Sequence, residues 1–273
     1  MPVASTLKDR FLETRDRVRA AAQRAGNDPD RVIMVAVTKY ADPEQIRELL
    51  HLGHLDFGEN RVQQLIQRAA LIDEYLERER RLADVGVSQG PPLPAPSDVR
   101  WHMIGRIQRN KVKKAAEVSR LIHSVDSLRV AEEIQTAAVK RVQPVNILLQ
   151  INASDEPQKG GVTLPAARHV ADQITTMVNV HLRGVMTMAA LTDDEREVRR
   201  AFSRARECFE ELRAHGVGRD DEAQGGGFNI LSMGMSNDFE IALEEGANLV
   251  RIGSAIFGDP PSHASAADEP DED

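Results

Sequence analysis

The feature of this sequence that most limits its fold is a regular alternation of short apolar segments with longer helix-like segments. The apolar segments are rich in β-branched residues and lack helical spacing, which indicates strands buried on both faces. We count eight of them, at residues 31–39, 55–58, 100–104, 121–125, 145–152, 181–188, 228–233 and 248–252. Strands that alternate with helices form parallel βαβ units, and eight such units suit a closed (β/α)8 barrel. We therefore predict an α/β fold with a single TIM barrel; an open doubly wound sheet is the alternative.

Capping residues mark several helix boundaries. Asp42 and Pro43, with Gln45 three residues after the cap, predict the start of one helix. A helix after Thr192 is expected to end at Gly216, and residues 236–238 are expected to cap another that ends near Gly246. The N-terminal residues predict an extra amphipathic helix ahead of the barrel.

Two segments fall outside the barrel pattern. Residues 85–98, rich in proline, are expected to form a flexible surface insertion. Residues 259–273, which contain six acidic residues and no lysine or arginine, are expected to be a disordered tail. We therefore expect one domain over residues 1–258, followed by that tail.

The charge balance excludes some classes of partner. The formal charge is −8, and without the six acidic residues of the tail it is −2. A nearly neutral body argues against nucleic acid as the main partner and against a polybasic membrane anchor. No apolar stretch is long enough to span a bilayer, and the N-terminus has no continuous apolar signal core. With a single cysteine, Cys208, the chain is expected to be cytoplasmic, without an internal disulfide.

Polar residues follow several strands, at the end of a barrel where active sites form. Lys39 follows the first predicted strand and Asn60 the second. An amine that emerges from an apolar wall loses hydration of its charged form, which favours a nucleophilic lysine that forms a Schiff base. A lysine at a strand end can also simply extend into solvent.

The last two predicted strands are followed by residues suited to an anion. Ser232, Met233 and Ser236 belong to one loop with a glycine turn, and Gly253 and Ser254 precede a short helical turn. Barrels commonly bind phosphate after strands seven and eight. Turn and cap chemistry explains either cluster alone, but their coincidence predicts a phosphate site. Arg251, inside the last strand, needs an acceptor, which could be a ligand ring nitrogen, a carbonyl or a carboxylate.

Other candidate residues favour structural roles. The run of Arg106, Arg109, Lys111, Lys113 and Lys114 suggests a nucleic-acid patch, but on a helix it spreads over more than one face, which favours a solvated surface. His51 and His54 share a helix face without a third ligand nearby, so we expect no metal site. His102 and His123 belong to the third and fourth strands and fit core histidines.

Six motifs together resemble a known family. They are VAVTKY at residues 35–40, DFGENRVQQ at 56–64, WHMIGRIQRNKVK at 101–113, INASDEPQKGGV at 151–162, LRGVMTMA at 182–189 and SMGMSNDFEIALEEGANLVRIGSAIFG at 232–258. In order and content they resemble the pyridoxal phosphate homeostasis proteins, the YggS/PROSC family. That family is similar to the N-terminal barrel of alanine racemase. Arg106 and Ala189 stand where family members often have proline, which leaves the local loop geometry open.

The resemblance implies a cofactor site for pyridoxal 5′-phosphate (PLP). Lys39 would hold PLP as an internal aldimine, with Asn60 beside the ring and Arg251 near the pyridine nitrogen. The residues implied for the phosphate are Ser232, Gly253 and Ser254, and Ser236 would bind phosphate or cap the following helix. Met233 is also expected to be a cofactor-binding residue.

The implied function is PLP binding without robust catalysis. Arginine beside the pyridine nitrogen would keep that nitrogen unprotonated, which weakens the ring as an electron sink. Alanine racemase-like enzymes add a second domain with a tyrosine base, whereas this chain has two tyrosines, Tyr40 and Tyr75, and only the tail after residue 258. We expect a monomer or weak homodimer that buffers PLP or delivers it to PLP-dependent apoenzymes, and so affects amino-acid and keto-acid balance. The alternative is a PLP-dependent amino-acid racemase or lyase.

Overall fold

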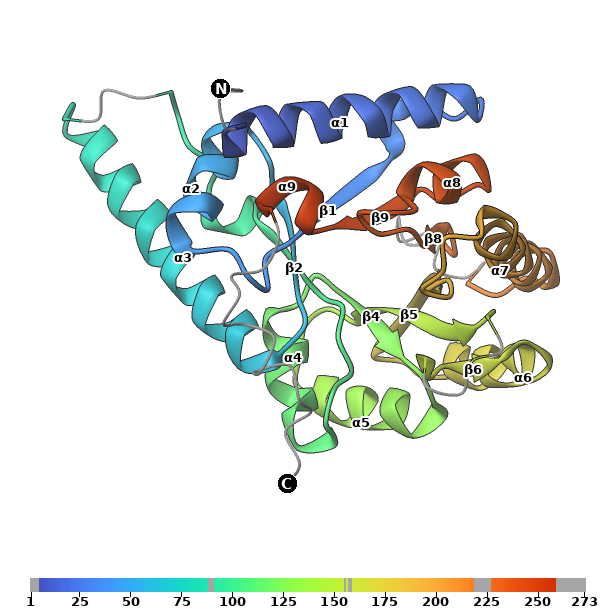
Figure 1. Cartoon of the computed structure of the whole chain (residues 1–273). Helices are drawn as coiled ribbons and strands as arrows, with labels where there is room; N and C mark the ends of the chain where they lie inside the picture. Colours follow the sequence, from blue (N-terminus) through green and yellow to red (C-terminus); the bar gives the residue numbers. More distant parts are fainter. Residues whose placement is uncertain (1–4, 88–90, 155, 157–158, 219–226, 259–273) are drawn as a thin grey trace.

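The computed structural model describes residues 5–87, 91–154, 156, 159–218 and 227–258 (Figure 1). The acidic tail, residues 259–273, lies outside the described residues, so its expected disorder stays a prediction. The same holds for residues 88–90 in the middle of the proline-rich segment.

Eight parallel strands in the described residues close into a barrel. They hydrogen-bond in the order β1–β2–β3–β4–β5–β7–β8–β9, and β9 pairs with β1. Their bounds are β1 (Ile33–Val37), β2 (Asp56–Glu59), β3 (Arg100–Met103), β4 (Leu121–Val125), β5 (Val145–Asn152), β7 (Val180–Met186), β8 (Ile230–Ser232) and β9 (Leu249–Ile252). A two-residue strand, β6 (Val162–Thr163), pairs with β5 beside the barrel. The closure confirms the predicted TIM barrel and excludes the open sheet.

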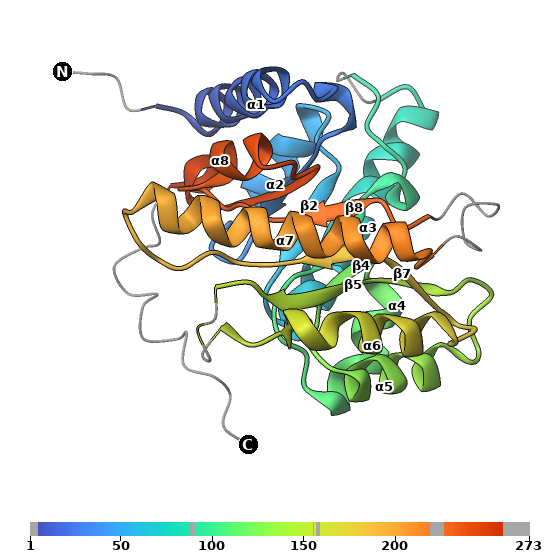
Figure 2. The same cartoon turned by 90° about the vertical axis from the view of Figure 1, so that its right-hand side faces the viewer.

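Helices surround the barrel. They are α1 (Leu7–Arg24), α2 (Pro43–His51), α3 (Val62–Asp84), α4 (Val112–Val118), α5 (Leu128–Ala138), α6 (Leu164–Thr175), α7 (Glu195–His215), α8 (Phe239–Glu244) and α9 (Ser254–Phe257). Short 3-10 turns lie at η1 (Pro29–Arg31), η2 (Pro96–Asp98) and η3 (Arg109–Lys111). Figure 2 shows α6 and α7 side by side on one flank. Within the described residues, we find no helix long and apolar enough to cross a membrane.

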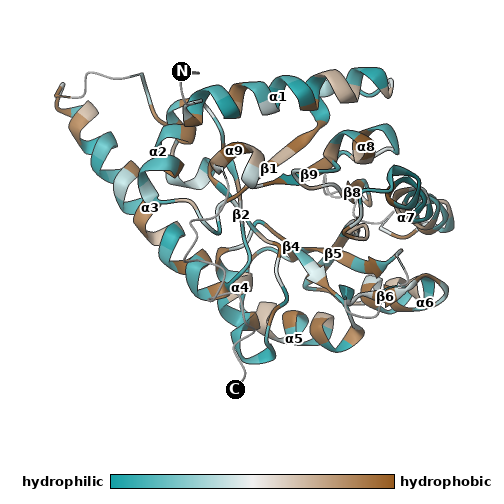
Figure 3. Cartoon of the chain, viewed as in Figure 1, coloured by the Kyte–Doolittle hydropathy of each residue, from teal (hydrophilic) through white to brown (hydrophobic). Residues whose placement is uncertain are grey.

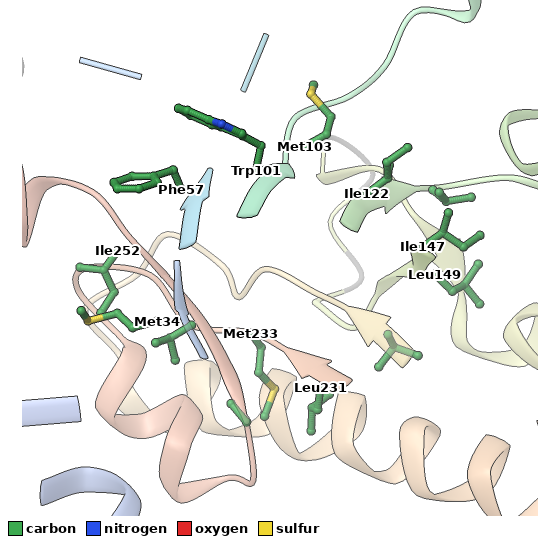
Figure 4. Close-up of a cluster of buried hydrophobic side chains, with 14 of the residues drawn as sticks. Met34, Phe57, Trp101, Met103, Ile122, Ile147, Leu149, Leu231, Met233 and Ile252 are labelled. Atoms are coloured by element: carbon green, nitrogen blue, oxygen red, sulfur yellow. The ribbon is translucent and has the colours of Figure 1, made fainter. Parts of the chain in front are cut away.

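Strand residues alternate between the barrel interior and the layer beneath the helices. The larger core fills that outer layer, with Phe57, Trp101 and Met233 among its buried members (Figure 4). Apolar residues of the helices, brown in Figure 3 among teal ones, also belong to this core. A smaller cluster that includes Val35 and Leu249 lies inside the barrel. Two layers of apolar contacts thus hold the strands from both sides, as uninterrupted β-branched strands predict.

The predicted helix ends agree with the structure at two helices. Asp42 caps α2 by accepting from the Gln45 N–H at 2.8 Å, and the Gln45 side chain accepts from the Asp42 N–H at 3.0 Å. The helix α7 ends at Gly216, whose φ of 97° is a left-handed conformation suited to glycine. The first strand is shorter than predicted, because residues 29–31 form η1 and the chain turns after Val37.

The predicted N-terminal helix is α1, which lies against α8 and α9 (Figure 1).

The C-terminal part of the proline-rich segment, residues 85–98, packs against the barrel domain. There Leu93 packs against the larger core, and the Asp98 carboxylate accepts from the Ala95 N–H at 2.9 Å in η2. The expected flexibility of this segment stays a prediction.

Candidate functional site

Lys39 lies in a turn just beyond β1, at the carboxyl end of the barrel. The turn is closed by the Ala41 N–H, which donates to the Thr38 carbonyl at 2.9 Å. The side chain of Lys39 is half-buried, and its Nζ lies 4.3 Å from the centroid of the Tyr40 ring. The amine therefore leaves the barrel beyond the apolar strand, against an aromatic face.

A buried ion pair fixes the backbone of this turn. The Arg68 guanidinium, from α3, contacts the Glu59 carboxylate and the Thr38 carbonyl, and its Nη2 donates to the Ala41 carbonyl at 2.7 Å. Glu59 is completely buried and also accepts from the Thr38 hydroxyl. Burial raises the pKa of Glu59, an effect that the charge of Arg68 and these hydrogen bonds partly offset. The pair thus holds both ends of the turn that carries Lys39.

The loop between β8 and α8 makes a tight glycine turn. Gly234 has a φ of 94°, and a Cβ there would lie 2.6 Å from the Ala242 Cβ, so another residue does not fit without movement. Asp238 closes the loop, since its carboxylate accepts from the Met235 N–H at 2.5 Å. Burial raises the pKa of Asp238.

Ser236 does not cap α8, which was one of its two expected roles. The helix begins at Phe239, so Asp238 occupies the cap position and Ser236 lies too early in the chain. The Ser236 hydroxyl instead accepts from the N–H groups of Gly253 and Ala255, at 3.2 and 3.3 Å. Two amides at the start of α9 therefore converge on one point at the carboxyl end of the barrel.

The N-terminal helix α1 supports this short turn from behind. The Arg10 Nε donates to the Ile256 carbonyl at 2.9 Å, and the Thr14 hydroxyl donates to the Ala255 carbonyl at 3.4 Å. A single helical turn leaves its carbonyls without partners inside the helix. Because α1 binds those carbonyls, the amides of α9 stay directed at Ser236.

Arg251 lies inside the barrel beneath these loops and is 4 % exposed. Its Nη1 donates to the Ser232 hydroxyl at 2.7 Å and its Nη2 donates to the Thr187 carbonyl at 3.0 Å. Both acceptors are neutral. No salt bridge between Arg251 and a carboxylate is observed among the described residues. Burial lowers the pKa of Arg251 to about 10, so the guanidinium remains charged at neutral pH.

Buried side chains extend from Arg251 down the barrel as one hydrogen-bonded row. The Ser232 Oγ lies 3.1 Å from the His123 Nδ1, and the His123 Nε2 lies 3.0 Å from the His102 Nδ1. The His102 Nε2 lies 3.1 Å from the Asp56 Oδ1 at the opposite end of the barrel. Burial, with the nearby His102 and Arg251, lowers the pKa of His123 well below its usual value. The two histidines are core residues, as expected, but they also link the two ends of the barrel.

The remaining predicted site residues differ in exposure. Asn60 and Ser254 are exposed at the carboxyl end of the barrel, and Gly253 leads directly into α9. The Met233 side chain is completely buried in the outer core (Figure 4), so it does not reach this surface. Ser232 is also completely buried, with its hydroxyl between Arg251 and His123.

Asn60 also lines a cavity of about 960 Å³ formed with the loops after β3 and β4. Three cations of the predicted basic run, Arg106, Arg109 and Lys111, line this cavity, while Lys113 and Lys114 are exposed on α4. The basic run is therefore divided between a cavity and a helix surface.

Sequence reasoning missed the residues that position the site. Glu59 entered the sequence analysis only as part of the motif at residues 56–64, and no role was expected for Arg68 or Arg10. Arg10 contacts a carbonyl 246 residues away, and no local spacing signals such a pair. The Glu59 carboxylate at the end of β2 was the one available signal, because a buried acid in a barrel needs a cation.

Comparisons with known proteins agree with this fold. A family profile described as the alanine racemase N-terminal domain matches residues 14–261. The pyridoxal phosphate homeostasis protein of Pseudomonas aeruginosa is 34 % identical over 254 residues, which are 93 % of this chain and 96 % of that protein. The one from Escherichia coli K12 is 33 % identical over 91 % of this chain and 94 % of its own length.

Solved structures show the same fold. PipY of Synechococcus elongatus, solved with PLP bound, is 32 % identical with a TM-score of 0.66, over 89 % of this chain and 99 % of that one. Alanine racemase of Corynebacterium glutamicum is 16 % identical with a TM-score of 0.60, over 91 % of this chain and 61 % of that one, which is a likeness of fold alone. This chain therefore belongs to the pyridoxal phosphate homeostasis proteins, within the alanine racemase N-terminal domain family.

Proposed function

We propose that this protein binds PLP at the carboxyl end of its barrel and serves PLP homeostasis, by buffering or delivery, without robust turnover. The observation that carries the proposal is the convergence of the Gly253 and Ala255 amides beside the strand that leads to Lys39. A phosphate needs N–H and O–H donors in such an arrangement. The PLP-bound structure of the relative PipY supports the choice of ligand.

The residues at this surface suit the phosphate and the aldehyde of PLP. The amides of Gly253 and Ala255, with the hydroxyls of Ser236 and Ser254, would hold the phosphate. The amine of Lys39 would bind the aldehyde covalently, because β1 and β9 are neighbours and end at the same surface. Asn60, exposed two strands away from β9, would lie beside the ring.

Arg251 and Ser232 would act beneath the ring rather than on the phosphate. PLP supplies a pyridine ring that withdraws electrons most strongly when its nitrogen is protonated. The guanidinium of Arg251 remains positively charged at neutral pH and is held in place by Ser232 and Thr187. A fixed cation disfavours a proton on a nitrogen beside it. This arrangement favours holding the cofactor over carbanion chemistry.

The test is cofactor retention together with a search for turnover. Purified protein is incubated with PLP, separated from free cofactor and assayed for bound PLP, alongside Lys39→Ala and the exposed control Lys113→Ala. We expect close to one PLP per chain in the wild type and in Lys113→Ala, and loss of retention in Lys39→Ala. Exchange of the α-proton of a panel of amino acids into deuterated solvent measures turnover. Lys39-dependent exchange at an enzymatic rate would instead establish the racemase or lyase alternative.

A further inference from the structure

The orientation of Arg251 depends on one backbone group and one side chain. Its Nη2 donates to the Thr187 carbonyl at 3.0 Å, and its Nη1 donates to the Ser232 hydroxyl at 2.7 Å. Backbone pairing holds Thr187 in place, since its N–H donates to the Ser232 carbonyl at 3.1 Å. A serine side chain has three staggered positions, and rotation between them moves its hydroxyl. The direction of Arg251 therefore depends on what holds the Ser232 side chain.

His123 is the other neighbour of the Ser232 hydroxyl. Its Nδ1 lies 3.1 Å from the Ser232 Oγ, and both residues are completely buried. The contact crosses the barrel interior from β4 to β8 and joins residues 109 positions apart in the chain. On the far side of the ring, the His123 Nε2 lies 3.0 Å from the His102 Nδ1. Contacts at both ring nitrogens thus fix the imidazole against Ser232.

The donors and acceptors around Ser232 give the direction of its bond with His123. A guanidinium only donates, so the Ser232 oxygen accepts from Arg251 and the hydroxyl proton needs a separate acceptor. Among the described residues, the His123 Nδ1 is the only other hydrogen-bond partner of this hydroxyl. Ser232 therefore donates to an unprotonated Nδ1. Burial, with the nearby His102 and Arg251, lowers the pKa of His123 well below its usual value, which keeps the imidazole neutral and able to accept.

Removal of this acceptor would change the surroundings of Arg251. The hydroxyl proton of Ser232 would then be buried without a partner, which is unfavourable. Rotation of the Ser232 side chain brings the proton to another acceptor, but the same rotation takes the oxygen away from Arg251. The guanidinium would retain only the Thr187 carbonyl. The position of Arg251 is therefore coupled to the acceptor at residue 123.

We propose that His123 is a positioning residue of the cofactor site: it accepts from the Ser232 hydroxyl and so keeps the Arg251 guanidinium at the carboxyl ends of β7 and β8. The position of the guanidinium is a property of the protein alone, whereas the consequence for PLP rests on the function proposed above. In that function Arg251 lies beneath the ring, so its displacement alters the surroundings of the pyridine nitrogen. His123 acts on the cofactor through two other side chains, without touching it.

Two substitutions at position 123 separate the hydrogen bond from the packing. His123→Asn keeps an acceptor, since the asparagine Oδ1 is the same number of bonds from Cβ as the histidine Nδ1. His123→Leu fills the space with an apolar side chain that cannot accept. Ile122→Ala is the control for lost packing, because Ile122 is a completely buried neighbour on β4 that belongs to the outer core (Figure 4).

Crystal structures of the protein without PLP test the position of Arg251. We expect the hydrogen bond between Arg251 and Ser232 to be broken in His123→Leu and kept in His123→Asn and Ile122→Ala. A bond that survives in His123→Leu overturns the proposal. The nitrogen NMR signal of His123 in the wild type adds a test that does not depend on the folding of a variant. We expect an unprotonated Nδ1, and a protonated Nδ1 at neutral pH overturns the proposal.

Titration with PLP, followed by visible absorption, tests the effect on the cofactor. In His123→Leu we expect a shifted band across a pH series and about fivefold weaker binding, which corresponds to the loss of one hydrogen bond. His123→Asn should restore both, and Ile122→Ala should lower stability without moving the band. An identical band and affinity in His123→Leu and the wild type overturn the role at the cofactor site. A wild type without a band refutes the proposed function instead, while the crystal structures and the NMR signal still decide the position of Arg251.

Discussion

Replacing Arg68 by methionine tests how the protein positions Lys39. The substitution keeps an unbranched apolar stem but removes the guanidinium. The Arg68 side chain is 16 % exposed, and the Glu59 carboxylate that it faces is completely buried. Removing one partner of a buried pair typically costs about 3–5 kcal/mol. The carbonyls of Thr38 and Ala41 also lose their donor. We expect Arg68→Met to lower the free energy of unfolding by about 4 kcal/mol at pH 8.

The loss of unfolding free energy in Arg68→Met should be larger at high pH than at low pH. Without its cation, Glu59 has a folded-state pKa raised further above its unfolded value of about 4.3, because burial already raises it. The folded variant then disfavours the ionised carboxylate more than the wild type does, so the deficit relative to the wild type grows as the pH rises from the raised pKa of the wild type through the still higher pKa of the variant. Urea unfolding at pH 5 and pH 8 should show the smaller deficit at pH 5.

Two variants control this experiment. Arg78→Met removes a more exposed arginine of the same helix, which faces Glu79 at 3.4 Å, and is expected to cost less than about 1 kcal/mol. The double variant Glu59→Gln with Arg68→Met removes the buried charge and should recover much of the loss. PLP retention should fall in Arg68→Met, because the turn of Lys39 loses its anchor. A deficit below about 1 kcal/mol at pH 8, or one that is the same at both pH values, would refute the reasoning.

Three further predictions follow from the contacts described above. Gly234→Ala should cost about 3 kcal/mol, because φ is 94° and the new Cβ would lie 2.6 Å from the Ala242 Cβ, whereas Gly26→Ala, with φ 73° and no atom within 4 Å, should cost about 1 kcal/mol; equal losses in urea unfolding would contradict this. Arg10→Leu should weaken PLP binding several-fold, because α9 loses a donor to one of its carbonyls, and unchanged affinity in equilibrium dialysis would show that α1 does not support the site. The half-buried His54 has its pKa lowered to about 4 by desolvation, so the unfolded chain takes up its proton first and wild-type stability should fall by up to roughly 3 kcal/mol between pH 6.5 and 4. His54→Phe should remove that part of the slope in urea unfolding across this range, and an unaltered slope would disprove the assignment.

The barrel could be predicted from the sequence because its signals are local. The signals lie within a few residues of the structure that each one sets. They are the β-branched residues of the short strands, the cap residue Asp42 and the helix-ending Gly216. The alternation of strands and helices left two main topologies. A sheet of parallel strands joined by helices forms either a closed barrel or an open sheet. The pairing of β4 with β5 decided between them, and that contact is not local.

The supporting contacts of the site could not be predicted in the same way. Arg68 lies on a helix whose sequence reads as an ordinary amphipathic surface, and only the closed barrel brings it to Glu59 and Thr38. His102 and His123 were placed on the correct strands, but their alignment with Ser232 depends on the register between strands. Ser236 was expected to bind phosphate or to cap α8, and it does not cap this helix because α8 begins at Phe239, two residues later than a cap at Ser236 would give.

The central claim is that Lys39 is the residue that binds PLP, and one measurement tests it directly. The PLP-loaded protein is reduced with borohydride, digested, and the peptide that carries the cofactor is identified by mass spectrometry. We expect a visible absorption band that disappears on reduction and one labelled peptide, with the label on Lys39. Label on another lysine such as Lys159, or no label after reduction, would contradict it.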